Sequence, residues 1–503
     1  MTLVSRFVRE QRRYTKDELK DIFRYENDDY GIQQFIKNLK AYGVLKSVKK
    51  NSEHLELSDL TDDDFEITDG SEISGKCYYV FSFVGIITYR DRIIKAYPKY
   101  MLTDCDDDTL TLRMHRVIKV LEKYNNSRDQ IINQYNGYGE DEGYNTLSVM
   151  LFLLRDYFDN GIYSNSESIT EINGEGDILW DRTIDESFCI ISDGRPYYTD
   201  IYTKKTVDDN TDYFKNLHKY IITDCSRQLR EAQLDQLFGL ETELLSPFVL
   251  SDFGGLEYIK SRIHDELNIQ FNTRKQILLK TIDAYLDHNE KLLKDNFGLS
   301  MYGTNAYNAV WERMCAEVFD NKLDKTLLEL DFLKIPTKGS PEKDVDFTCD
   351  EKLIEVIKKP LWENSKRNIK YEAQKTLKPD TITVSYDKER CFIILDAKYY
   401  NLKLEKDTKL SGNPGVEDVT KQYLYQLAYK EFLEFIGIKK VKNYFLMPTE
   451  KNEIIPYGIA IMPIFKDLDL ENIQIRLLPG ELVENFYLSN KKIPIKELEE
   501  VKQ

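Results

Sequence analysis

The amino-acid sequence predicts a mixed α/β protein with several domains. With 503 residues, the chain is too long for a single hydrophobic core of ordinary size. Hydrophobic residues make up 41% of it and charged residues 31%, which is typical of a folded globular protein. Helical and strand patterns alternate along the chain, and the last third has the order helix, strand, strand, helix, strand.

Residues 1–70 predict a small winged-helix-like module. Thr15 followed by Glu18 fits a capping box that opens a first helix, and Gly43 fits the end of a second helix. The strand-like segment VLKSV follows directly, so the order is helix, helix, strand. Modules of this kind either read DNA bases or mediate protein contacts, and both roles stay open.

Residues 71–299 predict a central α+β region. The segment CYYVFSFVGIITYRDRIIKAYPKYM has strand composition on both sides of a polar turn at residues 89–92, which indicates a hairpin. Helical spacing follows in LRMHRVIKVLEKY and in NTLSVMLFLLRDYFDNG. A turn and a short strand are expected in EINGEGDILWDRTIDE, and the stretch from about residue 209 to 299 is mostly helical.

Residues 300–503 form the third predicted domain. Its first helix carries one apolar stripe, formed by Tyr307, Trp311, Met314, Cys315, Val318 and Phe319. A loop with Pro and Gly follows near IPTKGSPEKDVDF. The segments TITVSY and CFIILDAK have strand composition and are joined by the polar DKER, so they predict a hairpin. The helix VTKQYLYQLAYKEFLEF and the strand KNYFLMP follow.

The composition argues against several classes of protein. A charged N-terminus and the absence of long apolar runs indicate a cytoplasmic protein without a membrane role. Seven cysteines without CxxC pairs favour reduced thiols over disulfides or a zinc site, and the five histidines lack HxH or HExxH spacing. The net charge of -17 argues against binding duplex DNA with the whole surface, since phosphate contacts need lysine and arginine.

One basic segment stands out against this acidity. Between positions 358 and 380, only Glu363, Glu372 and Asp380 are acidic. The basic residues are Lys358, Lys359, Lys366, Arg367, Lys370, Lys375 and Lys378. Two interpretations stay open, namely a local contact with nucleic acid and an ordinary solvated helical face.

Two carboxylates and a lysine are expected at one end of the last predicted hairpin. Asp380 begins the first strand and Asp396 lies near the end of the second, so their carboxylates can converge. Asp396 and Lys398, two apart on a strand, point to the same face. Two close carboxylates repel each other unless a cation lies between them, and hard oxygen ligands suit Mg²⁺. Such a site supports phosphodiester hydrolysis, whereas a surface salt bridge is the structural alternative.

These residues also resemble a known family. Lys378-Pro379-Asp380 with Asp396-Ala397-Lys398 resembles the PD-(D/E)xK nuclease motif, and ILDAKYY resembles its version in the nuclease subunits of McrBC-type restriction systems. The segments EINGEGDILWDRTI, VWERMCAEVF and GVEDVTKQYLYQLAYK resemble LlaJI-type restriction endonucleases, which are McrC-like. The resemblance implies a C-terminal PD-(D/E)xK domain and a metal-dependent endodeoxyribonuclease that uses Mg²⁺, with Mn²⁺ as a substitute.

The resemblance assigns roles to the motif residues. It implies that Asp380 and Asp396 ligate the metal and that the backbone carbonyl of Ala397 adds a further ligand. Lys398 would orient or deprotonate the attacking water.

Two further site residues are implied from neighbouring helices. Nucleases of this kind often add a glutamate from the preceding helix, and Glu312 is the match, with Glu317 as the substitute and an ordinary solvated glutamate as the alternative. A glutamine after the motif strand is also common. Gln422 and Gln426 lie four apart on one helical face, and Gln422 is preferred.

The resemblance also implies partners. McrC-like subunits act with a McrB-like hexameric AAA+ GTPase that binds and translocates duplex DNA, and their N-terminal part docks on this motor. This chain contains no GxxxxGK[ST] P-loop, so nucleotide hydrolysis would come from the partner. The N-terminal module is an addition to the McrC-like pattern, and its role stays open.

Three functions follow from these observations. The first is a Mg²⁺-dependent nuclease subunit of a restriction system that defends against phage. The second is an inactive assembly or stimulatory subunit, and the third is a stand-alone PD-(D/E)xK repair nuclease. Asp380, Asp396 and Lys398 are all present, which favours the first function over the second.

Overall fold

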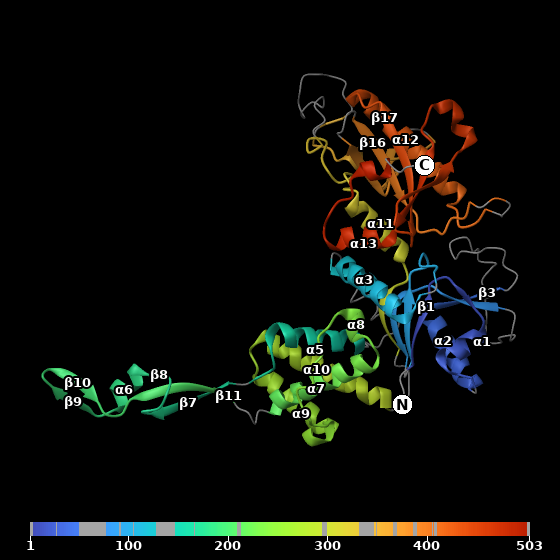
Figure 1. Cartoon of the computed structure of the whole chain (residues 1–503). Coiled ribbons are helices and arrows are strands. Elements are labelled where there is room, and N and C mark those ends of the chain that lie inside the picture. Colours follow the sequence, from blue (N-terminus) through green and yellow to red (C-terminus); the bar gives the residue numbers. More distant parts are fainter. Residues whose placement is uncertain are drawn as a thin grey trace. The chain divides into compact units, whose positions relative to one another are not determined.

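The computed structural model describes residues 4–26, 28–49, 77–89, 92–103, 105–126, 146–164, 166–208, 213–293, 299–330, 347–348, 350–365, 370–385, 390–404, 406 and 410–499. These residues form several sheets and helices, which confirms the mixed α/β prediction (Figure 1). Residues Met1–Gln134 and Met301–Gln503 pack into one compact unit, and Tyr135–Ser300 form a second. The three predicted domains stay a prediction, since compactness alone does not define a domain. None of the described helices is long and apolar enough to span a membrane.

Two small sheets open the first unit. One has the order β1-β6-β5-β12 and the other β2-β4-β3. Their strands are β1 (Val4–Arg9), β2 (Arg13–Tyr14), β3 (Leu45–Lys49), β4 (Cys77–Phe81), β5 (Val84–Tyr89), β6 (Arg92–Tyr97) and β12 (Leu299–Thr304). β5 and β6 pair antiparallel, which confirms the predicted hairpin, although its turn residues 90 and 91 lie outside the described residues.

The helices between these strands begin and end as their sequence indicates. Before α1 (Lys16–Phe23), the Glu18 amide donates to the Thr15 hydroxyl at 3.1 Å and the Thr15 amide donates to the Glu18 carboxylate at 2.7 Å, so the capping box is confirmed. After α2 (Asp29–Ala41), Gly43 adopts a φ of 67°. The third helix of this part is α3 (Asp107–Asn126).

A five-stranded sheet with the order β15-β16-β17-β19-β18 forms the C-terminal part of the first unit. β15 (Thr381–Ser385) and β16 (Cys391–Ala397) pair antiparallel, which confirms the second hairpin, while residues 386–389 of its turn lie outside the described residues. β16 is parallel to β17, and β17 to β19. The other strands are β17 (Lys440–Thr449), β18 (Ile455–Ala460) and β19 (Ile473–Pro479).

Helices cover this sheet. α12 (Val416–Ile436) connects β16 to β17 and packs against both, with Tyr429 and Phe432 in one apolar cluster and Tyr423 in another. α11 (Tyr307–Val318) packs against α13 (Gly480–Leu488). Five residues of the predicted apolar stripe are buried within α11, and the sixth, Phe319, is buried at its C-cap. Short 3-10 helices lie at η4 (Leu353–Val356), η5 (Pro463–Leu468) and η6 (Ile495–Leu498). Most of the predicted loop near residues 335–347 lies outside the described residues.

The basic segment forms a β-hairpin, so the interpretation as a helical face is wrong. β13 (Leu361–Glu363) pairs antiparallel with β14 (Lys370–Glu372) in a two-stranded sheet. Lys366 and Arg367 lie outside the described residues. All residues of both strands are exposed.

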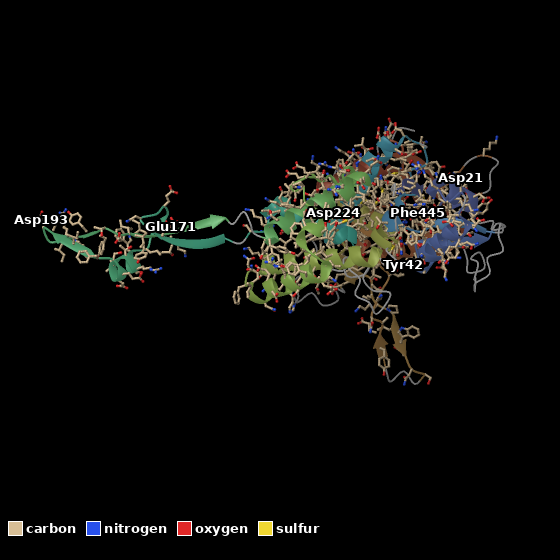
Figure 2. The ribbon with its side chains drawn as sticks, turned by 90° about the horizontal axis from the view of Figure 1, so that it is seen from below. Asp21, Tyr42, Glu171, Asp193, Asp224 and Phe445 are labelled. Carbon is tan, nitrogen blue, oxygen red and sulfur yellow. The ribbon has the colours of Figure 1, made fainter. Side chains whose placement is uncertain are left out.

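The second unit combines helices with a long β arm. The helices are α5 (Thr146–Asn160), α7 (Tyr213–Glu231), α8 (Asp235–Phe238), η3 (Leu250–Phe253), α9 (Leu256–Ile269) and α10 (Thr273–Leu293), as the helical patterns predicted. Residues 166–208 form what we call the β arm, shown in Figures 1 and 2. It contains β7 (Ser166–Ile172), β8 (Asp177–Ile178), α6 (Trp180–Glu186), β9 (Cys189–Ser192), β10 (Arg195–Tyr198) and β11 (Tyr202–Asp208). Asp193 and Gly194, both with positive φ, form the tight turn between β9 and β10.

Candidate active site

The β15–β16 hairpin brings Asp380 and Asp396 together at one end of the five-stranded sheet. The register pairs Thr381 with Leu395, so the next position, Asp380, lies beside Asp396. The Ala397 amide donates to the Asp380 carboxylate at 3.1 Å, which ties this carboxylate to the residue that follows Asp396. Asp396 is only 4% exposed. The hairpin therefore places a buried carboxylate, Asp396, beside a half-buried one, Asp380.

Lys398 lies between two carboxylates. Its Nζ atom is 3.2 Å from Asp396 Oδ2 and 3.1 Å from Asp418 Oδ1. Asp418 belongs to the first turn of α12, where a negative charge is favourable at the positive end of the helix dipole. The Lys398 amide also donates to the Leu446 carbonyl of β17 at 2.9 Å. Both ends of this residue are thus held, one by the sheet and the other by the two aspartates.

α11 contributes Glu312 to the same cluster. The indole of the adjacent Trp311 donates to the Leu446 carbonyl at 3.2 Å, the same carbonyl that accepts from the Lys398 amide. Burial and the nearby charge of Asp380 raise the pKa of Glu312 to about 7. Glu317, the predicted substitute, instead pairs with Arg313 at 2.8 Å. Of the two glutamates, Glu312 is the one with electrostatic contact to the motif residues.

The two candidate glutamines lie on the buried face of α12. Gln422 donates to the Tyr444 carbonyl of β17 at 3.4 Å, and its Oε1 is buried without a hydrogen-bond partner among the described residues. Gln426 instead uses both ends of its amide on the backbone of Glu471. The side-chain oxygen of Gln422 is therefore available to accept a hydrogen bond, whereas that of Gln426 already accepts one from the Glu471 amide. The role of Gln422 in the site stays a prediction.

The cluster holds more negative than positive charge. Burial raises the pKa of Asp396 well above its ordinary value, and its hydrogen bond with Asp380 adds to the increase. Burial alone would lower the pKa of Lys398, but the charges of Asp396, Asp418 and Asp380 outweigh it and raise this pKa. Burial and the same carboxylates raise the pKa of Tyr425, on α12, to about 12. Additional positive charge would therefore stabilise the ionised carboxylates.

This donor set fits a magnesium ion with a largely aqueous shell. Among the described residues, no group of three or more His, Cys, Asp or Glu side chains is arranged to enclose a metal. Mg²⁺ does not require such a cage, because it keeps several waters and takes one or two carboxylates together with phosphate oxygens. The adjacent carboxylates of Asp380 and Asp396 meet that requirement, and Glu312 lies nearby.

A buried polar network lies directly behind the motif lysine. The Tyr399 hydroxyl donates to Glu10 at 2.6 Å and accepts from the Lys99 amide at 3.1 Å. The Tyr100 hydroxyl donates to Glu484 of α13 at 2.5 Å, and its ring packs edge-on against Tyr399. Glu10, Lys99 and Tyr100 of the N-terminal part therefore complete the packing next to Lys398.

Sequence reasoning missed Asp418 and Tyr399. A weak signal existed for Asp418, because it precedes Gln422 by four positions and so lies on the same helical face. No local pattern links Tyr399 to Glu10, which lies 389 residues earlier.

Comparisons with known proteins agree with the motifs. A family model described as LlaJI restriction endonuclease matches residues 83–332 and 347–478. A Bacillus subtilis (strain 168) protein described as "Type II restriction enzyme BsuMI component YdjA" is 28% identical over 421 residues, covering 82% of this chain and 81% of that protein.

Two solved structures from Thermococcus gammatolerans are also similar. A chain from an assembly of McrB AAA+ hexamers with bound McrC has a TM-score of 0.35 and 12% identity, covering 97% of this chain and 99% of that one. A chain from the McrBC complex has a TM-score of 0.23 and 12% identity, covering 61% and 85%. Neither TM-score is high enough to support an argument. The family model, in contrast, spans most of the sequence, and the chain therefore belongs to the LlaJI restriction endonuclease family.

Proposed function

We propose that this chain is a Mg²⁺-dependent endonuclease subunit that hydrolyses phosphodiester bonds of duplex DNA in a phage-defence restriction system in the cytoplasm. The observation that carries the proposal is the position of Lys398 between Asp396 and Asp418, at the sheet end that also holds Asp380. Membership in the LlaJI restriction endonuclease family supports it. The finer assignment of the C-terminal part to the PD-(D/E)xK fold, and of the N-terminal module to the winged-helix class, belongs to this proposal.

Each site residue has a role in this proposal. Asp380 and Asp396 would hold Mg²⁺, with Glu312 and the Ala397 carbonyl as further ligands. When bound, the ion would neutralise phosphate charge and acidify a water molecule. Lys398, whose pKa is raised, stays protonated at neutral pH, so it donates hydrogen bonds that orient the water or the phosphate instead of removing a proton.

Gln422 and Asp418 act from α12. Asp418 fixes the direction of the Lys398 ammonium group through their contact at 3.1 Å. The buried Oε1 of Gln422, which has no partner among the described residues, can accept a hydrogen bond from a group that enters the site.

The partner in this proposal is a McrB-like AAA+ GTPase hexamer that brings the nuclease to DNA. The β arm supports the need for a protein partner, because most of its large apolar side chains are exposed. These side chains are Ile172, Ile178, Trp180, Ile184, Phe188, Ile190, Ile191 and Tyr197. Apolar groups gathered in this way favour contact with another protein surface.

Plasmid cleavage tests the proposal. The full chain is incubated with plasmid DNA, Mg²⁺ and GTP, with and without the product of the neighbouring gene. Cleavage is expected only in the mixture, with Mn²⁺ able to replace Mg²⁺ and EDTA abolishing it. Asp396→Ala should abolish cleavage while leaving the circular dichroism spectrum and partner binding unchanged. Cleavage by a clean preparation of that variant would overturn the assignment.

A further inference from the structure

The β13–β14 hairpin leads directly into the candidate active site. Below its strands, the Ala373 amide donates to the Pro360 carbonyl at 2.8 Å and the Thr376 hydroxyl donates to the Lys358 carbonyl at 3.0 Å. Before β13, Ile357 is buried in the apolar core under the five-stranded sheet. After β14, the chain continues to Asp380. The hairpin is therefore anchored both to the core and to a motif carboxylate.

Two aromatic side chains occupy one face of this hairpin. Trp362 and Tyr371 are direct cross-strand partners, so their rings lie on the same face. They are 69% and 65% exposed. The other face carries Leu361 and the ion pair between Lys370 and Glu363, at 2.9 Å. In Figure 2 the two strands (brown) extend away from the neighbouring ribbon.

The charge around the aromatic pair is the opposite of the charge of the whole chain. Positions 358–380 hold seven basic and three acidic residues and so carry a net charge of +4, whereas the whole chain has -17. Of the seven, Lys366 and Arg367 lie outside the described residues. Lys359, Lys375 and Lys378 are among the exposed residues of this segment. A locally positive surface on an acidic protein attracts phosphate groups.

Tyr371 lies close enough to Asp380 for one DNA duplex to contact both the hairpin and the candidate active site. Nine residues separate Tyr371 from Asp380, and a chain spans at most about 3.6 Å per residue, so the two lie within about 32 Å. Nine or ten base pairs of duplex, at about 3.4 Å each, cover this distance. A duplex whose phosphate lies at Asp380 therefore extends far enough to meet the aromatic pair.

We propose that the β13–β14 hairpin is a DNA-binding arm, in which Trp362 and Tyr371 contact bases and the exposed Lys359, Lys375 and Lys378 contact phosphates. This inference rests on the proposed function, since it takes DNA as the substrate. In duplex DNA the base faces are covered by neighbouring base pairs, so the rings would insert at a base step and partly unstack it, a contact that needs no particular sequence.

Binding of DNA by the full chain carrying Asp396→Ala tests the arm without cleavage. The probe is a fluorescent duplex of about 30 base pairs, longer than the reach of the hairpin, and anisotropy is measured without divalent metal. Trp362→Ala combined with Tyr371→Ala should weaken binding about tenfold or more, which corresponds to about 1.4 kcal/mol. Leu361→Ala, from the opposite face of the same hairpin and similarly exposed, should bind like its parent.

Tryptophan fluorescence gives a second measurement. The chain has three tryptophans, and after Trp180→Phe only the buried Trp311 and the exposed Trp362 remain. DNA should quench the emission of this variant, and additional Trp362→Phe should remove the quenching.

Two results would overturn the inference. One is a DNA affinity that the Trp362→Ala and Tyr371→Ala double variant leaves unchanged, together with no quenching by DNA in the Trp180→Phe variant, which keeps Trp362. The other is loss of binding to the product of the neighbouring gene with DNA affinity intact, which would make the hairpin a protein contact. Because the readout is binding, it is separate from the cleavage assay: retained cleavage by Asp396→Ala contradicts the proposed function, whereas these two results contradict only the arm.

Discussion

The candidate active site and the β arm depart from ordinary side-chain distribution in opposite ways. The site buries charge, with Asp396 only 4% exposed and in contact with Lys398. The arm exposes apolar side chains, with Phe188 at 74% and Ile191 at 76% exposure. Both arrangements are unfavourable for an isolated chain, since buried charge and exposed apolar area each cost free energy. We infer that different ligands stabilise the two regions: a cation with phosphate for the first, and a protein surface for the second.

Loss of the motif lysine should have the largest effect. Lys398→Met keeps most of the aliphatic stem but removes the ammonium group that orients the water or phosphate, so cleavage should fall by about 100-fold or more. Rates are measured with saturating partner and Mg²⁺. Lys430→Met, an exposed lysine of α12, is the control and should cut like the unmodified chain. Near-normal cleavage by Lys398→Met would show that the buried charge cluster has no role in the reaction.

Asp418→Asn should have the next largest effect. It removes the charge that holds Lys398 at 3.1 Å, and loss of such an orienting group typically costs about 10- to 100-fold in activity. The turnover rate should fall while KM for DNA stays the same. Glu417→Gln changes a neighbouring carboxylate of the same helix turn and should have little effect. Equal losses in both variants would indicate a general effect on the helix start.

Polar substitution in the β arm tests whether its exposed apolar side chains contact a protein partner. Phe188→Ser with Ile191→Ser should lower affinity for the product of the neighbouring gene by about tenfold or more, because it removes two exposed apolar contacts. Affinity is measured by calorimetry with the full chain. Ile269→Ser, an exposed apolar residue outside the arm, is the control. If only the control weakened binding, the docking surface would lie elsewhere.

The smallest expected effect concerns pH. The pKa of Glu312 is raised from 4.5 to about 7, so the folded state favours its protonated form. Its contribution to stability is therefore fully present below pH 4.5 and is lost as pH rises through about 7. Without metal, the Tm of the unmodified chain relative to Glu312→Gln should fall by about 2–4 °C over this range at most, because solvent screening weakens a half-buried charge.

Magnesium and a second variant complete this test. Added Mg²⁺ should reduce the difference at pH 7 and above, since the ion favours ionised carboxylates. Glu317→Gln should show the pH profile of the unmodified chain. If the Tm of Glu312→Gln and that of the unmodified chain changed with pH in the same way, Glu312 would not interact with the carboxylates of the site.

The predictable part of the site is the part encoded locally. Asp380, Asp396 and Lys398 belong to one hairpin, and a period of two residues along a strand sets the side chains that share a face. The helices were predictable for a similar reason, since the capping box before α1 and the apolar stripe of α11 are local patterns.

The remaining geometry depends on packing between distant segments. Asp418 reaches Lys398 only because α12 crosses from β16 to β17, and no residue pattern gives the order of the five strands. The hairpin at 361–372 was interpreted as either a DNA contact or a helical face, because scattered lysines have no period that separates strand from helix.

The hydrogen bond between Tyr399 and Glu10 can form only late in translation. Glu10 and Tyr399 are 389 residues apart, and ribosomes add about 5–20 residues per second, so Glu10 is synthesised about 20–80 s before its partner. Tyr135–Ser300 are completed within that interval. The N-terminal segment therefore remains without its final packing for most of translation. In a chain that ends before Tyr399, Glu10 and Lys99 lack the aromatic side chain that contacts both of them in the full chain.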